Sequence, residues 1–145
     1  MNRKEFIRIC SGSCLGLLGI SLLSQSCKST HYVQTTLTDN RLQINMSEFV
    51  AVSDNKTFYR KYIIAKTDNL QYPIVIYRNT DNSFTALLLR CTHQGIELNV
   101  NGDLITCSAH GSEFGKTGEV VTGPAEQKLK SFPVIVGEQY LYINL

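Results

Sequence analysis

The sequence predicts an all-β domain, an antiparallel sandwich or small barrel. From Arg41 onward, short runs of β-branched, aromatic and aliphatic residues are separated by residues that favour turns, which is typical of consecutive strands. Near the end of the chain, Leu141, Ile143 and Leu145 alternate with more polar positions, as expected for a half-buried strand. The sequence shows no long amphipathic helical pattern and no internal repeat.

The strands follow one another along the chain with a turn signal in most of the gaps. The predicted strands are 41–45, 58–66, 74–78, 84–90, 97–100, 103–106, 130–136 and 140–145. Asp-Asn pairs at 54–55, 68–69 and 81–82 and a glycine at 137 occupy the gaps, and these residue types accept the backbone angles of turns. Asn101-Gly102 predicts a tight hairpin that pairs 97–100 with 103–106.

This hairpin brings together two short segments that carry metal-binding side chains. The first places Cys91 two residues before His93, and the second places Cys107 three residues before His110. Four such donors can hold a metal centre, and zinc also accepts two cysteines with two histidines. A purely structural pair of cysteines is a third interpretation of the same residues.

The two segments, with their spacing, resemble the ligand loops of the Rieske [2Fe-2S] family. In that family two cysteines bind one iron and two histidines bind the other, which implies that Cys91 and Cys107 share the buried iron and that His93 and His110 share the outer one. The family's second loop continues as His-Gly-Ser, which Ser112 completes. The resemblance covers roughly 41–145 and implies one Rieske-type [2Fe-2S] cluster per chain.

Further family features are present in part. Gly123 and Pro124 match the proline-containing third loop that covers the cluster, so the resemblance places them with the cofactor-binding residues. Ile96 and Ala109 stand where high-potential members carry two disulfide-linked cysteines, and Phe114 stands where a tyrosine donates to a cysteine sulfur. The resemblance therefore implies a reduction potential in the lower or middle part of the family range, roughly −150 to +300 mV.

The beginning of the chain predicts export to the bacterial cell envelope. Three basic residues precede an apolar run at 14–23, which is the layout of an export signal over 1–26 and is short for a membrane span. The signal resembles the twin-arginine type, with Lys4 in place of the second arginine. Cys27 follows Leu23-Ser24-Gln25-Ser26 and resembles a lipoprotein cleavage site, so we expect its lipidation; an uncleaved anchor and a plain cleaved signal are the alternatives.

Residues 28–40 are polar and rich in serine and threonine, and we expect 27–40 to form a flexible tether before the domain at 41–145. The formal net charge of +2 comes from the leader and does not indicate nucleic-acid binding. His31 lies in this tether, where we expect no ligand role.

The resemblance implies an electron-transfer protein without a catalytic site of its own. A Rieske oxygenase also needs a mononuclear iron held by two histidines and a carboxylate, and only one of the three histidines remains once two bind the cluster. We expect a one-electron carrier that is membrane-tethered on the periplasmic side and relays electrons from quinol to a cytochrome-type partner. The alternative is a small non-catalytic subunit of a periplasmic molybdenum or haem oxidoreductase.

Overall fold

The computed structural model describes residues 30–145. The predicted export signal and Cys27 lie outside the described residues. Fifteen strands and one short 3-10 helix make up this part of the chain. In order they are β1 (Tyr32–Gln34), β2 (Leu37–Thr38), β3 (Arg41–Asn45), η1 (Met46–Phe49), β4 (Val50–Ser53), β5 (Lys56–Tyr59), β6 (Tyr62–Lys66), β7 (Ile74–Thr80), β8 (Ser83–Leu88), β9 (Asn99–Asn101), β10 (Leu104–Thr106), β11 (Glu113–Gly115), β12 (Val120–Thr122), β13 (Ser131–Phe132), β14 (Val134–Val136) and β15 (Tyr140–Asn144).

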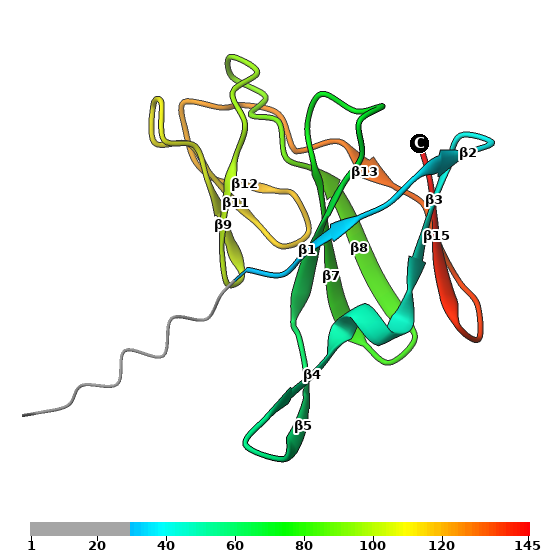
Figure 1. Cartoon of the computed structure of the whole chain (residues 1–145). Coiled ribbons are helices and arrows are strands. Elements are labelled where there is room, and N and C mark those ends of the chain that lie inside the picture. Colours follow the sequence, from blue (N-terminus) through cyan, green and yellow to red (C-terminus); the bar gives the residue numbers. More distant parts are fainter. Residues whose placement is uncertain (1–29) are drawn as a thin grey trace, which may run out of the picture.

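The strands form four sheets, and the predicted all-β fold is confirmed. The central sheet has the order β1-β6-β7-β8-β13, and two four-stranded sheets, β12-β11-β10-β9 and β14-β15-β3-β2, lie on either side of it (Figure 1). The fourth sheet is the β4–β5 hairpin, which projects from the body. All pairings are antiparallel except that of β1 with β6. Within residues 30–145, no helix is long and apolar enough to span a membrane.

The prediction of a flexible tether over 27–40 is wrong for the residues from Tyr32 onward. Strand β1 pairs in parallel with β6, and the Val33 side chain is buried in the core. His31, placed in the tether by the sequence, contacts Glu48 at 2.7 Å between Nε2 and Oε2. Backbone pairing and burial of Val33 offset the entropy lost when this polar segment is ordered.

Two long predicted strands are each divided in the structure. The run 58–66 is interrupted at Arg60, whose Nη1 donates to the carbonyl oxygen of Glu48 at 3.0 Å and also to that of Val50. The run 130–136 is interrupted at Pro133, which has no N–H to donate to a strand partner. Each interruption moves the chain from one sheet to another, so β5 and β6, like β13 and β14, belong to different sheets.

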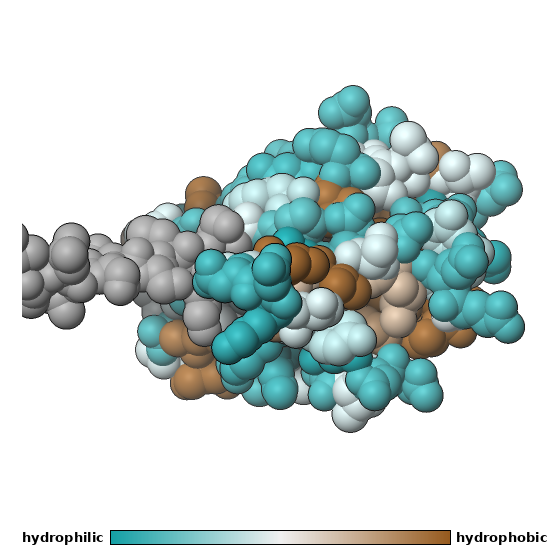
Figure 2. Space-filling model, turned by 60° about the horizontal axis from the view of Figure 1, so that its bottom comes forward, coloured by the Kyte–Doolittle hydropathy of each residue, from teal (hydrophilic) through white to brown (hydrophobic). Residues whose placement is uncertain are grey.

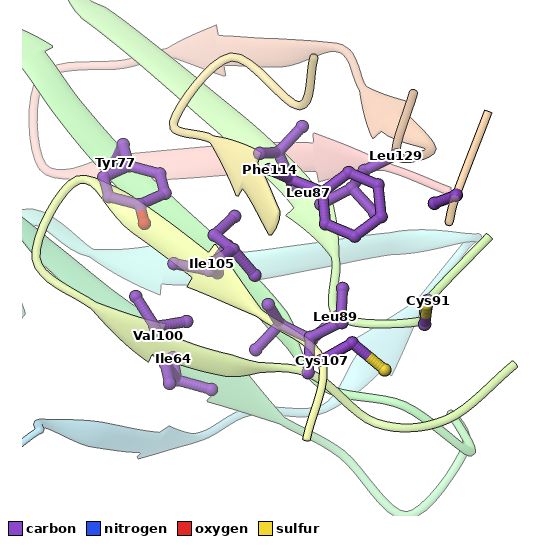
Figure 3. Packing of buried hydrophobic residues seen from close by; sticks show 13 residues of the cluster. Ile64, Tyr77, Leu87, Leu89, Cys91, Val100, Ile105, Cys107, Phe114 and Leu129 are labelled. Carbon is purple, nitrogen blue, oxygen red and sulfur yellow. The ribbon is translucent and has the colours of Figure 1, made fainter. Parts of the chain in front are cut away.

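Buried side chains form two clusters, and one of them supports the candidate site. The first lies between the central sheet and the β9–β12 sheet and contains both candidate cysteines at one end, together with Leu89 and Phe114 (Figure 3). The second lies between the central sheet and the β14-β15-β3-β2 sheet. On the face shown in Figure 2, hydrophilic residues predominate and hydrophobic ones form small separate groups.

Candidate metal centre

The first ligand loop is a six-residue turn that Cys91 begins and Ile96 closes. The Cys91 N–H donates to the Ile96 carbonyl at 2.8 Å, and the Gly95 N–H donates back to the Cys91 carbonyl at 2.8 Å. Gly95 has φ +72°, a left-handed conformation that glycine adopts without steric cost. This glycine therefore allows the chain to reverse within the loop.

The second ligand loop repeats this backbone pattern. The Cys107 N–H donates to the Ser112 carbonyl at 2.8 Å, and the Gly111 N–H donates to the Cys107 carbonyl at 3.0 Å. Gly111 has φ +76°. The two loops therefore match from cysteine to glycine, although histidine is the third residue of one and the fourth of the other. Each loop turns back at its glycine, in the left-handed conformation.

The β9–β10 hairpin joins the two loops. The prediction of a hairpin at Asn101-Gly102 is confirmed, with the two-residue connection one position later, since Asn101 pairs with Leu104. The Tyr77 hydroxyl of β7 donates to the Gly102 carbonyl at 3.0 Å, and burial raises the pKa of this tyrosine. Both ends of the hairpin are thus fixed, one by the ligand loops and the other by the central sheet.

The two candidate cysteines, which begin the two ligand loops, are buried next to each other. Cys91 is 2% exposed and Cys107 is 3% exposed, and the two form no disulfide. Burial raises the pKa of the Cys107 thiol, but hydrogen bonds from the Ala109 backbone, the Cys91 side chain and the His110 backbone lower it to below its ordinary value. The surroundings of Cys107 therefore favour the thiolate, which is the form that binds metals.

The two candidate histidines are exposed and lie next to each other. The rings of His93 and His110 have their centroids 5.0 Å apart and meet edge to face at 85°. The structure thus groups the four side chains by kind, cysteine with cysteine and histidine with histidine, although each loop supplies one of each.

A third loop covers the first two. Ser112 is fully buried, and its Oγ accepts a hydrogen bond from the Ala125 N–H at 3.0 Å. On the other side, the Thr92 hydroxyl donates to the Gln127 carbonyl at 2.6 Å. Gly123 and Pro124 are exposed beside these contacts and are joined by a cis peptide bond. The loop at 123–127 is therefore attached to both ligand loops, and all three lie at the end of the molecule opposite the β4–β5 hairpin (Figure 1).

Sequence reasoning missed several residues that support this tip. Thr92 and Gln127 join the first and third loops, and Tyr72 donates its hydroxyl proton to the Gly95 carbonyl at 2.6 Å. The position of Thr92 between two candidate ligands was the only sequence signal for its role. The Tyr72 contact joins positions 23 residues apart, and no local pattern indicates it.

Paired cysteines and histidines on matching loops of a small all-β domain indicate a metal-binding protein. A family model described as the Rieske [2Fe-2S] domain matches residues 48–133, more than half of the chain. The chain therefore belongs to the Rieske [2Fe-2S] family and carries a [2Fe-2S] cluster.

Known members of the family resemble parts of this chain. It is 30% identical over 83 residues to the iron–sulfur subunit of the toluene-4-sulfonate monooxygenase system of Comamonas testosteroni, a match that covers 51% of this chain and 24% of that one. It is 29% identical over 73 residues to the cytochrome b6-f complex iron–sulfur subunit of Chlorobaculum tepidum, covering 49% and 40% respectively. The chain thus spans less than half the length of these relatives.

A solved structure agrees with the fold. The plasma membrane Rieske protein PetC3 of the cyanobacterium Synechocystis superposes with a TM-score of 0.51 at 25% identity, over 59% of this chain and 87% of that one.

The residues at the tip fit a two-iron cluster. The Cys91 and Cys107 side chains are hydrogen-bonded to each other and the rings of His93 and His110 lie together, so the donors form two pairs of one kind each. Two separate pairs suit a dinuclear cluster, in which each iron takes two protein ligands. The Ser112 hydroxyl adds a further feature, since its oxygen accepts from Ala125 and its proton has no acceptor among the described residues.

Proposed function

We propose that this protein is a one-electron carrier of the bacterial cell envelope that relays electrons from quinol to a cytochrome-type partner. Cys91 and Cys107 bind the buried iron of the cluster, and His93 and His110 bind the outer iron. The observation that carries the proposal is the pairing of the exposed histidines at a tip whose cysteines are buried. Such a tip lets a partner protein approach the cluster from the histidine side.

The protein's own residues hold the site and limit access to it. When bound, the cluster supplies a centre that accepts and releases one electron at a time. The cysteines are enclosed by the first core cluster, and the loop at 123–127 shields the site on another side through Ala125 and Gln127. The Ser112 hydroxyl can donate its remaining proton toward a sulfide. His93 and His110 are exposed, so a partner can approach the site from the histidine side.

Two of the similar proteins support a redox partner at a membrane. One relative is named as a subunit of a cytochrome b6-f complex, and the superposed structure is named as a plasma membrane Rieske protein. The predicted leader at 1–26 and Cys27 agree with such a location.

A second candidate function is that of a non-catalytic electron-transfer subunit of a periplasmic molybdenum or haem oxidoreductase. The relative named as a subunit of a monooxygenase system favours a role of this general kind. This chain has three histidines in all, and His31 contacts Glu48, so we propose no catalytic site within it. Both functions use the same cluster and differ in the partner.

The two candidates differ in their electron donor. With membranes from the producing organism, addition of a quinol should reduce the full-length protein, as followed by the electron paramagnetic resonance (EPR) signal of the reduced cluster. We expect an inhibitor of quinol oxidation to block this reduction. Reduction that is insensitive to the inhibitor and depends on the substrate of a soluble oxidoreductase would favour the second function.

Replacing Cys27 tests the membrane anchor. We expect the Cys27→Ser variant to lose its lipid and to move from the membrane to the soluble fraction, because serine has no thiol to which the proposed lipid anchor could be attached. Fractionation followed by immunoblotting measures this, and Cys14→Ser inside the leader is the control. A Cys27→Ser protein that remains wholly with membranes would support an uncleaved anchor.

Replacing Ser112 tests its hydrogen bond to the cluster. A donor to a cluster sulfur stabilises the reduced, more negative state, so Ser112→Ala should lower the reduction potential. It also leaves the Ala125 N–H without its partner, which we expect to destabilise the fold by about 1–3 kcal/mol. Protein-film voltammetry measures the potential, and Ser108→Ala, an exposed serine of the same loop, is the matched control. Equal potentials for Ser112→Ala and the unmodified protein would show that other groups set it.

A further inference from the structure

An arginine side chain lies against the first ligand loop. Arg90 precedes Cys91, and its guanidinium is so close to Gly95 that a Cβ added there would be 3.2 Å from Nε and 3.3 Å from Nη2. The guanidinium also lies over the ring of Tyr72, with Cζ 5.7 Å from the ring centroid. The Tyr72 hydroxyl donates to the Gly95 carbonyl at 2.6 Å. Arg90, Tyr72 and Gly95 therefore form one contact on the side of the loop.

The positive charge of Arg90 is not neutralised by an acidic side chain of the described residues. The three ion pairs of residues 30–145 involve other side chains. Glu97 pairs with Arg90 through the backbone, and no side-chain ion pair joins them. Because a guanidinium stays protonated at every working pH, Arg90 places a constant positive charge beside the loop.

We propose that Arg90 raises the reduction potential of the cluster through its charge and that Tyr72 positions it, a role that rests on the ligand set proposed above. Reduction adds one electron, and so one negative charge, to the cluster. Arg90 contacts the first of the two loops that would hold this cluster. A nearby positive charge stabilises the reduced form relative to the oxidised form. Tyr72 holds the Gly95 carbonyl with its hydroxyl and supports the guanidinium with its ring.

Three variants of the full-length protein separate charge from packing. Arg90→Gln removes the charge and should shift the potential downward in protein-film voltammetry, with the electrode as the electron donor. Arg90→Lys keeps the charge, so its reduction potential should lie close to that of the unmodified protein. Arg41→Gln removes an exposed positive charge from β3, in another sheet, and should leave the potential unchanged. The difference between Arg90→Gln and the unmodified protein should shrink as ionic strength rises, because Arg90 is exposed and its field is screened.

Iron content and the EPR spectrum of the same samples report separately on the ligand set. A normal cluster spectrum with an unchanged potential in Arg90→Gln would overturn the role of Arg90 and leave the ligand set standing. Equal downward shifts in Arg90→Lys and Arg90→Gln would also overturn it, since packing rather than charge would then set the potential. Absence of a Rieske-type spectrum in the unmodified protein would overturn the ligand set and this inference together.

Discussion

The His110→Ala variant is expected to contain little or no [2Fe-2S] cluster. In the proposed ligand set, loss of one imidazole would leave the outer iron with a single protein ligand and open to solvent at the exposed tip. Cys107→Ala should have the same effect, because the buried iron of the proposed ligand set would then keep only Cys91. Iron and sulfide analysis, with the visible absorption spectrum, measures the cluster content of each purified variant.

The third histidine of the chain provides a matched control. His31 contacts Glu48 near β1, in a part of the fold distinct from the three tip loops. We expect His31→Ala to retain its full iron content and spectrum. A His110→Ala protein with as much cluster as the His31→Ala protein would contradict the proposed ligand set.

The Phe114→Ala variant is expected to lose about 3–5 kcal/mol of its free energy of unfolding, the usual cost of removing a buried aromatic side chain. Phe114 is fully buried on β11, in the same cluster as Cys91 and Cys107. Its ring is enclosed on the core side of the second ligand loop, so the cavity would form beneath the metal centre (Figure 3). For a domain whose total stability is about 5–15 kcal/mol, this loss is large.

Urea unfolding of the cluster-loaded protein, followed by circular dichroism, measures this cost. Phe58→Ala is the matched control, because Phe58 is 48% exposed on the projecting β5 strand. We expect the midpoint of Phe58→Ala to remain close to that of the unmodified protein. Similar midpoints for Phe114→Ala and Phe58→Ala would show that the ring of Phe114 contributes little to the core.

The strands that could be predicted are those with a strong local pattern. The run 41–45 is found unchanged as β3, and 74–78, 84–90 and 140–145 correspond to β7, β8 and β15 with shifted ends. Strands β3 and β15 have apolar residues in the second core, and β7 and β8 have apolar residues in both cores. In these strands the residues that favour a strand are also the residues that are buried. The local sequence pattern was therefore sufficient to predict the strands.

The missed strands have short or polar sequences that tertiary contacts stabilise. Strand β1 is ordered by its parallel pairing with β6, a contact between segments about thirty residues apart that no local pattern reveals. Strand β2 has a local sequence signal, the pair Asp39-Asn40 that connects it to β3. Asp39 and Asn40 both have positive φ, 49° and 59°, as do Asp54 and Asn55 of the predicted turn, 51° and 59°. The same residue pair makes a two-residue hairpin turn at both places.

The candidate ligands were proposed from their spacing and the family resemblance, whereas the environment of these residues could not be predicted from the sequence. Cys-x-His and Cys-x-x-His are visible in the sequence, and so is the glycine that ends each loop. That the two spacings fit an identical backbone turn follows only from the hydrogen bonds of the loops. The contact of Arg90 with Gly95 depends in turn on side-chain packing around Tyr72.

The most direct test of the proposed metal centre is EPR of the reduced full-length protein, prepared with ¹⁵N-labelled histidine and examined by pulsed methods that resolve coupling to nitrogen. The account predicts a reduced [2Fe-2S] signal that couples to two histidine nitrogens, from His93 and His110, together with two irons and two sulfides per chain. A signal without histidine coupling, or a protein with one zinc and no sulfide, would contradict it.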